Sequence, residues 1–499
     1  MGAPAEKGPY SDLNTRVFSG FLFPALGGLL FGYDIGATSF AFSDDQAAKD
    51  LSITDDALKG TMTAMSLYGA LAISVFLYFF GDAIGRKKEM LAASVLYIAG
   101  SVLSFATPIS DKNTGVAWLA SSRFIYGLGI GCAMHSVPVY ISEMAPSSVR
   151  GMLVSLKEAV IVVGMLLGYS AGALFNHAHG WKIAYLGGAL FAFVFGIGCT
   201  FLPDSPRWLI LRSLSQPDRY STKAQEALQW FRTSFDENQV ESELAEVRDT
   251  LAGQEVGTFA ELLKAKRQMI VGNGLLLFQQ ITCQPSVLYY SVTIFKSAGF
   301  GSSSSTIASV GVAAVKLVAT MVAGLRVDQY GRRPLLLVGT TGIMLSLFGM
   351  GLAFQLGYED GTGDSDGSLT KVWGMVCVGC VLVLVTSYQI GFGPISWLMI
   401  SEVFPLRIRG MALSVGSMVN FGGNIIVANT FPVVLSALGS GPSFFMFSVI
   451  AAVAIVFIHF VIPETKGKTL EEIEEMMSSD EQRSSKDLTH NLLGKATLV

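Results

Sequence analysis

The chain has 499 residues, of which 51% are hydrophobic and 14% charged, with a formal net charge of −4. Soluble globular proteins contain roughly a quarter of charged residues, so this composition excludes an ordinary soluble domain and predicts that lipid surrounds much of the chain. The nearly balanced charge gives no indication of a nucleic-acid partner, and we expect none.

Twelve apolar windows of about 20 residues, the length that a helix needs to cross ~30 Å of hydrocarbon, are spaced along the chain. The sequence therefore predicts an all-α membrane protein with twelve transmembrane helices in two six-helix halves. The windows fall near 17–40, 60–80, 90–107, 115–138, 152–175, 182–202, 268–295, 304–326, 334–355, 372–400, 410–436 and 441–462.

The polar segments divide the chain further. In the linker between the halves, Thr222-x-x-Gln225 is a capping-box pattern, and we expect two to four short helices there. The C-terminal tail is expected to hold one short acidic helix, Leu470 to Met477. Basic residues in the loops on the linker side indicate that this side faces the cytosol. We expect a cytosolic tail at 1–16 with no cleaved signal peptide, a first half at 17–206, a cytosolic linker at 207–266, a second half at 267–465 and a cytosolic tail at 466–499.

Two motifs occur once in each half. The pattern S-E-x-x-P-x-x-x-R-G-M stands at 142–152 and again at 401–411, and D-x-x-G-R-K/R stands at 82–87 and at 328–333. Such pairing indicates two halves of similar design. The two offsets, 259 and 246 positions, differ, which predicts an insertion in the second half; the polar run at 358–370 is its candidate.

The acids and arginines of these repeats lie at the expected cytosolic helix ends. There we expect them to form interhelix ion pairs that hold one conformation closed, which is a gating role and not a solute site. The residues concerned are Asp82, Arg86, Glu143, Arg150, Asp328, Arg332, Glu402 and Arg409.

Small residues recur at every fourth position in the first and fifth windows, a pattern typical of close helix packing in membranes. Asp34 is two residues from both Gly32 and Gly36, which places it about 200° around the helix from each glycine. If the glycines face a neighbouring helix, the carboxylate faces away from it. The two stripes are Gly28, Gly32, Gly36 and Gly164, Gly168, Gly172.

The first half also carries ionisable residues within its apolar windows, and such residues are costly in lipid and usually mark function. We interpret four of them as proton-coupling candidates: Asp34, Arg123, His135 and Glu158. Each has an alternative. Asp34 can have a purely structural role, and Glu158 can lie at a solvated helix end. Arg123 can be a helix-end residue that extends to the interface, and His135 can equally be a hydrogen-bonded core histidine.

The second half instead offers neutral amides, accompanied by aromatic rings. An amide donates and accepts hydrogen bonds at once, which suits a polyhydroxylated neutral solute, and an aromatic face can cover the apolar side of a sugar ring. Pro285, Gly393 and Pro394 interrupt two windows near these amides, as at transporter binding sites. Helix–helix contacts between amides are the alternative. The candidate solute-binding residues are Gln279, Gln280, Gln284, Gln389, Trp397, Asn420 and Asn424, and the pairs Gln280/Gln284 and Asn420/Asn424 are each expected to share a helix face.

No metal cluster or activated nucleophile stands out in the sequence, so we expect no enzyme activity, no metal and no cofactor. Cys377 and Cys380 have metal-ligand spacing, but they lie within an apolar window without polar neighbours. Buried free thiols are the better interpretation.

Together these motifs resemble the sugar porter family of the major facilitator superfamily, over residues 17–470. Within that family, FPALG at 23–27, SLKE at 155–158 and SYQ at 387–389 are most similar to the plant vacuolar glucose transporter branch. The matching family motifs are GYD at 32–34, the two D-x-x-G-R-K/R copies, R-x-x-x-G-x-G-x-G at 123–131, P-x-Y-x-x-E-x-A-P-x-x-x-R-G at 138–151, PDSPR at 203–207, QQ at 279–280, G-x-G-P-I-x-W at 391–397 and PETKG at 463–467.

The resemblance implies a transporter that works by alternating access, with a small neutral sugar and protons as partners in the lipid bilayer. It places Gln279, Gln280, Trp397, Asn420 and Asn424 at sugar-contacting positions and Asp34 at the acid of proton-coupled members. The expected function is proton-coupled transport of a monosaccharide, a hexose such as glucose, in the vacuolar or plasma membrane. The alternatives are a facilitative uniporter or a non-transporting sugar sensor.

The chain departs from the family pattern at three positions. Glu158 stands where most relatives have a sugar-binding Gln, Pro285 where many have Asn, and Lys316 where Asn is common. We expect Lys316 and Glu158 to neutralise each other or a neighbour across the two halves.

Overall fold

The computed structural model of the chain describes residues 14–43, 45–232, 237–252, 258–357, 370–468 and 470–477. Three expectations fall wholly or largely outside these residues: the N-terminal tail at 1–16, the insertion at 358–370 and the end of the C-terminal tail. The first half contains α1 (Thr15–Ala41), α2 (Ala47–Asp50), α3 (Asp56–Ile84), α4 (Arg86–Phe105), α5 (Lys112–Met144), α6 (Ser147–Leu174) and α7 (Gly180–Phe201).

Four helices follow in the linker, α8 (Pro206–Ser215), α9 (Pro217–Phe231), α10 (Glu237–Ala252) and α11 (Phe259–Lys264). Thr222 lies inside α9, because Pro217 already occupies its first turn, so the predicted capping box at Thr222 is wrong. The second half contains α12 (Lys266–Ile281), α13 (Gln284–Tyr289), α14 (Ser291–Ser297), α15 (Ser302–Tyr330), α16 (Arg332–Leu356), α17 (Lys371–Ile390), α18 (Phe392–Val403), α19 (Leu406–Leu438) and α20 (Ser440–Val461), and the short tail helix α21 (Leu470–Met477) is confirmed.

Eleven segments in the described part of the chain are long and apolar enough to cross a membrane, with α17 and α18 counted as one. The expected seventh crossing is missing from this set because it is divided into α12, α13 and α14. Cys283 has a φ of 71°, which turns the chain between α12 and α13, and Pro285 starts the new helix. Gln280 and Gln284 therefore lie on different helices, and the expectation that they share a helix face is wrong.

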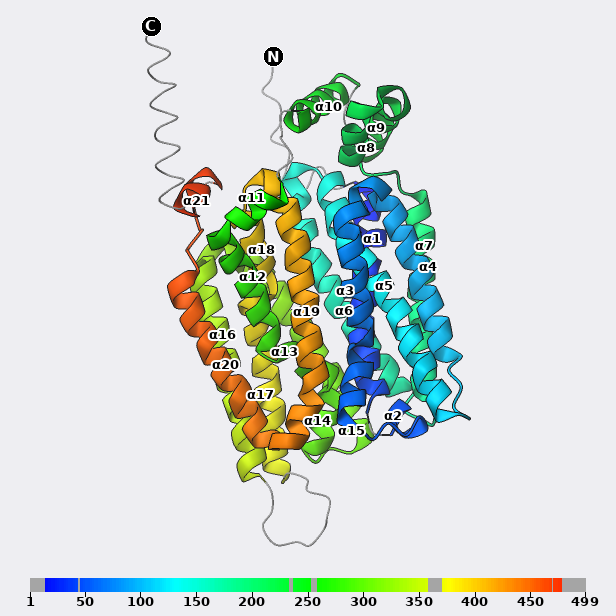
Figure 1. The fold of residues 1–499 in the computed structure, drawn as a ribbon, viewed down its shortest axis with the longest axis vertical. Coiled ribbons are helices and arrows are strands. Elements are labelled where there is room, and N and C mark those ends of the chain that lie inside the picture. Colours follow the sequence, from blue (N-terminus) through cyan, green and yellow to red (C-terminus); the bar gives the residue numbers. More distant parts are fainter. Residues whose placement is uncertain are drawn as a thin grey trace.

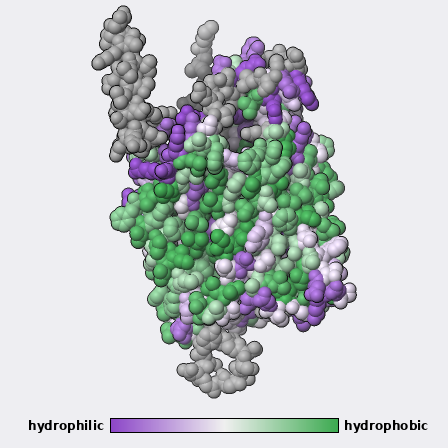
Figure 2. Space-filling model, in the orientation of Figure 1, coloured by the Kyte–Doolittle hydropathy of each residue, from purple (hydrophilic) through white to green (hydrophobic). Residues whose placement is uncertain are grey.

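The helices form two side-by-side bundles, with α1–α7 in one and α12–α20 in the other (Figure 1). Helices α8, α9 and α10 lie at one end, which we call the linker end; α2 and α14 lie toward the opposite end (Figure 1). A broad apolar band covers the visible face between two more hydrophilic ends (Figure 2). This surface fits a bilayer around the middle of the two bundles.

Close backbone contact between α1 and α6 fixes the interior of the first half. A Cβ on Gly32 would lie 1.8 Å from the carbonyl oxygen of Ile161, and a Cβ on Gly168 would lie 2.3 Å from that of Tyr33. The predicted close packing of both glycine stripes is confirmed, and the structure shows that the two stripes face each other. Asp34 consequently points away from α6 and toward α3 and α5, where its partners lie.

We predict that Gly32→Ala lowers the thermal stability of the detergent-solubilised protein. The added methyl group cannot fit against the α6 backbone, and such overpacking typically costs about 1–3 kcal/mol. The matched control is Gly311→Ala in α15, where nothing lies within 4 Å of an added Cβ. The control should leave the melting temperature unchanged or raise it slightly. Equal melting temperatures for the two variants would contradict the packing described.

Candidate functional site

An arginine–aspartate pair lies in the middle of the first half. Arg123 of α5 donates through Nη2 to Asp34 Oδ2 at 2.8 Å and through Nη1 to Asp34 Oδ1. Each side chain is 1% exposed. This is the two-pronged geometry in which a guanidinium binds a carboxylate most strongly. The alternative that Arg123 extends to the membrane interface does not apply in this structure.

Hydroxyl groups and aromatic rings complete the surroundings of the pair. Arg123 Nη2 also donates to Thr38 Oγ1 at 2.8 Å and to Ser66 Oγ at 3.1 Å, and Ser66 Oγ donates to Asp34 Oδ2 at 2.9 Å. The guanidinium lies 4.7 Å from the ring centre of Tyr185. The charges are thus compensated locally, which the burial of an ion pair requires.

The other two proton-coupling candidates lie elsewhere. Glu158 pairs with its chain neighbour Lys157 at 3.0 Å and is 39% exposed. His135 contacts Glu89 of α4, with 2.8 Å between Nδ1 and Oε2. Glu89 is 1% exposed and was not a sequence candidate, because its helix begins only three residues earlier and its position predicts a solvated helix end. The structure brings neither Glu158 nor His135 into hydrogen-bond contact with the Asp34–Arg123 pair.

In the second half, hydrogen bonds join the helices around the two chain breaks. Asn420 of α19 donates to Gln279 of α12 at 3.1 Å, and Gln279 in turn donates to the backbone carbonyl of Phe392 at 3.1 Å. Gln389 of α17 donates to Thr320 Oγ1 of α15. Gln279, Gln389 and Asn420 therefore serve at least partly as helix–helix contacts, which was the alternative to solute binding.

Other amides of the same region keep polar atoms without a protein partner. Gln280 Oε1, Gln284 Nε2 and Asn424 Oδ1 are buried and make no hydrogen bond to the described residues. Buried polar groups are nearly always paired in folded proteins. A set of unpaired donor and acceptor atoms on α12, α13 and α19 is therefore suited to a hydroxylated ligand between these helices. We call the candidate solute-binding residues Gln279, Gln280, Gln284, Gln389, Trp397, Asn420 and Asn424 the central site.

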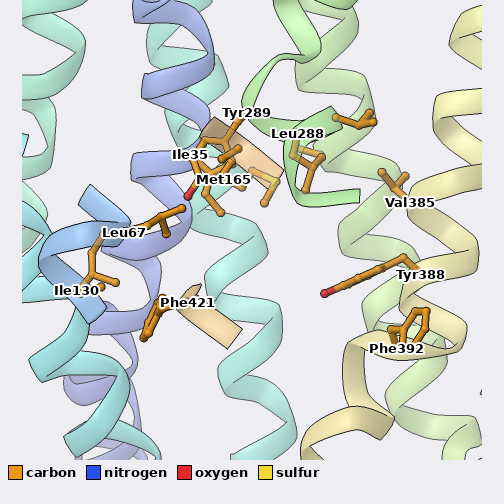
Figure 3. Close-up of a cluster of buried hydrophobic side chains, with 14 of the residues drawn as sticks. Ile35, Leu67, Ile130, Met165, Leu288, Tyr289, Val385, Tyr388, Phe392 and Phe421 are labelled. Carbon is orange, nitrogen blue, oxygen red and sulfur yellow. The ribbon is translucent and has the colours of Figure 1, made fainter. Parts of the chain in front are cut away.

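Aromatic side chains border the central site. Figure 3 shows Tyr388 extending from α17 with its hydroxyl pointing toward the side occupied by Ile35, Leu67 and Met165 of the first half. Phe421 of α19 makes an edge contact with Phe31 of α1, with 6.4 Å between ring centres. Trp397, on α18, remains partly exposed. Phe421, the chain neighbour of Asn420, thus meets a ring of the first half at the interface between the halves.

At the linker end, each half contains its own ion pair. Arg86 Nη2 lies 3.3 Å from Glu143 Oε1, and Arg332 Nη2 lies 2.9 Å from Glu402 Oε1. These pairs link helices within a half and do not join the halves. Arg409 donates instead to the backbone carbonyl of Phe404 at 3.1 Å. The side chains of Asp82, Arg150 and Asp328 lie outside the described residues.

A hydroxyl completes each of these ion pairs and was missed in the sequence. Ser205 donates to Glu143 Oε2, and Thr465 donates to Glu402 Oε2 at 2.6 Å. Both hydroxyls follow the last long helix of their half, in PDSPR at 203–207 and PETKG at 463–467. The shared P-acid-hydroxyl order, offset by 260 residues, was the signal that could have identified them.

The halves are joined at the opposite end. Asp45, after α1, forms an ion pair with Lys296 of α14 and accepts from Ser302 of α15 at 2.7 Å. Ser39 and Ser291 add a second link, with 3.2 Å between their hydroxyl oxygens. The hydrogen bonds from Lys296 and Ser302 hold the pKa of Asp45 below its ordinary value. These bonds join the two halves at the opposite end in this conformation.

Two bundles related by repeated motifs, with a polar site beside broken helices, are the architecture of a membrane transporter. Comparison with known proteins agrees. Residues 21–477 match the family model described as sugar (and other) transporter. The chain therefore belongs to this sugar porter family of the major facilitator superfamily.

Individual relatives refine the comparison. The chain is 42% identical to D-xylose-proton symporter-like 2 of Arabidopsis thaliana, over 91% of this chain and 89% of the relative. It is 41% identical to the chloroplastic D-xylose-proton symporter-like 3 of the same plant, over 94% of this chain and 84% of the relative. The solved proton:xylose symporter XylE bound to 6-bromo-6-deoxy-D-glucose superposes with a TM-score of 0.76 at 26% identity, over 93% of this chain and 99% of that chain.

The family prediction is confirmed, and with it sugar transport as the general activity of a multi-pass membrane protein. The finer placement in a vacuolar glucose transporter branch is not confirmed, because these relatives are named for xylose and proton symport. That placement stays a prediction.

We predict that Gln280→Ala and Asn424→Ala each weaken sugar binding by the central site. Losing a hydrogen bond to a buried polar group typically costs about 1–3 kcal/mol, or roughly a tenfold to hundredfold weaker affinity. The measurement is the dissociation constant for D-xylose and D-glucose on purified protein. The control is Asn113→Ala, an exposed amide at the start of α5, which should bind as the wild type does. Unchanged affinity in both central variants would place the solute elsewhere.

We predict that Asp45→Asn opens the opposite end. Spin labels at positions 49 and 304, in a background without the five native cysteines, should report a longer distance than in the parent protein. Because the pKa of Asp45 is lowered, its ion pair persists above the ordinary carboxyl pKa and weakens only as pH falls through the lowered value. The parent distance should therefore be the same at pH 7 and pH 5. An unaltered distance in Asp45→Asn would show that this pair does not hold the end closed.

Proposed function

We propose that the protein is a proton-coupled monosaccharide transporter, with a hexose such as glucose, or the related pentose xylose, as its solute. One observation supports this most strongly. A fully buried Asp34–Arg123 pair lies in the first half, while unpaired buried amides lie in the second. One site is suited to a proton and the other to a neutral hydroxylated solute.

The proton step follows from the geometry of the pair. A proton on Asp34 would remove the charge that Arg123 binds and would replace one acceptor by a donor. Protonation and separation of the pair are therefore linked. If one access state separates Asp34 from Arg123 and the other holds them together, the two states differ in proton affinity.

The solute step uses the interface between the halves. Residues of the central site lie on α12, α13 and α19, and Phe421 of α19 contacts Phe31 of α1. A sugar bound there stabilises one arrangement of the halves, and a proton bound at Asp34 stabilises one arrangement of α1 and α5. Two ligands that favour the same state bind cooperatively, which couples sugar movement to the proton gradient.

We further propose that the linker end faces the cytosol. The basic residues Arg86, Lys87, Arg332 and Arg333 lie at this end, as the distribution of positive charge in membrane proteins requires. The membrane concerned is proposed to be vacuolar or plasma membrane; the printed name of one relative adds the chloroplast as a third possibility.

We predict that Asp34→Asn abolishes sugar accumulation but retains sugar exchange. Asn is neutral at every pH and so cannot carry the proton. In proteoliposomes, a pH difference of one unit supplies about 1.4 kcal/mol per proton, enough for roughly tenfold accumulation by the wild type. Counterflow of labelled sugar in the same vesicles should persist in Asp34→Asn, although at a lower rate, because Arg123 loses its counter-charge.

The control is Glu226→Gln, which removes an exposed carboxylate from α9. It should accumulate sugar as the wild type does. Accumulation by Asp34→Asn at the wild-type level would exclude Asp34 as the proton site. A wild type that equilibrates sugar without accumulation would instead identify a facilitative uniporter.

A further inference from the structure

Lys316 of α15 is a buried cation at the central site. Lys316 is 7% exposed, and its ammonium makes no hydrogen bond or ion pair with any residue in the described ranges. The closest feature is the ring of Tyr388, whose centre lies 5.3 Å from Nζ. One helical turn along α15, Thr320 binds Gln389 of the central site. The ammonium is therefore unpaired among groups that we assign to solute binding.

The expected partner of Lys316 is already engaged. Glu158 lies within electrostatic reach of both Lys316 and Tyr388, but its carboxylate pairs with Lys157 at 3.0 Å. The expectation that Lys316 and Glu158 neutralise each other is thus not met in this conformation. The carboxylate of Asp34 is likewise engaged, by Arg123. The positive charge of Lys316 therefore has no ion-pair partner beside the central site.

Such a charge is unfavourable without an anion. The interior of a membrane protein solvates an ammonium poorly, and the face of an aromatic ring offsets only part of the loss. A neutral sugar hydroxyl can accept a hydrogen bond from Nζ but leaves the charge uncompensated. A carboxylate on the solute accepts the hydrogen bond and removes the net charge as well.

We propose that Lys316 gives the central site affinity for a sugar acid, a hexuronate whose carboxylate binds the Lys316 ammonium while its hydroxyls bind the amides of α12, α13 and α19. A hexuronate carries one negative charge, which matches the one cation in excess. A sugar phosphate carries nearly two and would leave an uncompensated negative charge. This inference rests on the proposed function, since it names a substrate class for the same site.

The test uses two probes that differ only at C6, D-glucuronate and D-glucose. Their dissociation constants are measured by calorimetry on the purified full-length protein in lipid nanodiscs, at pH 7. Wild type is expected to bind D-glucuronate at least as tightly as D-glucose. In Lys316→Gln, the preference for glucuronate over glucose should fall by about tenfold or more, equivalent to ~1.4 kcal/mol.

Two further variants separate charge from folding. Lys316→Arg keeps a cation at the site and should keep the preference within about threefold, which a merely structural role for the lysine would not predict. Lys371→Gln removes an exposed lysine from the start of α17 in the same half and should bind both probes as the wild type does.

The outcomes distinguish the two proposals. Wild type that binds D-glucose but not D-glucuronate would overturn the sugar-acid inference and leave the proposed function standing; in that case Lys316 is neutral or takes Glu158 as its partner. An unchanged preference in Lys316→Gln would overturn the inference as well. Wild type that binds neither probe nor D-xylose would contradict the proposed function itself.

Discussion

The buried pair of Asp34 and Arg123 is the interaction on which the account depends. Removing one partner of a buried ion pair typically costs about 3–5 kcal/mol, because the remaining charge is left without compensation. In the proposed mechanism, a proton on Asp34 removes the charge attraction that holds the pair together and so permits its separation. Close helix packing holds the pair in place. The glycines of α1 and α6 turn Asp34 toward α5, and a Cβ on Gly127 of α5 would lie 1.9 Å from the carbonyl oxygen of Ser66.

The two halves share a design at their ends and differ in their centres. At the linker end each half has an arginine, a glutamate and a hydroxyl in the same arrangement, Arg86–Glu143–Ser205 and Arg332–Glu402–Thr465. These clusters stabilise each half as a unit, whereas the Asp45–Lys296 pair at the opposite end joins the two units. In the proposed mechanism, motion between the halves changes the opposite end and the central site together, as alternating access requires. In the proposed function, the charged centre of the first half binds the proton and the amide centre of the second binds the solute.

Much of this architecture could be predicted from the sequence, since lipid imposes strong rules on composition and length. Eleven of the twelve expected crossings are long apolar segments in the described part of the chain, as the apolar windows predicted. Glycines at every fourth position predicted close helix packing for α1 and for α6, but not that these two helices are each other's partners. Helical spacing predicts a shared face only within one continuous helix. Because α12 ends at Ile281 and α13 begins at Gln284, the prediction that Gln280 and Gln284 share a face was wrong. The sequence also could not predict ion pairs that depend on side-chain rotamers. Adjacent residues point to different sides of a helix, yet the long side chains of Lys157 and Glu158 meet.

The most direct test of the central claim is to follow protons and sugar together. Wild-type protein is reconstituted in weakly buffered vesicles with no imposed gradient, and labelled D-xylose or D-glucose is added outside while a dye reports the external pH. A proton-coupled symporter should make the external medium more alkaline as the sugar enters, with about one proton removed for each sugar, because a single carboxylate is available at the Asp34–Arg123 pair. Entry of labelled sugar with no change in external pH would contradict the account.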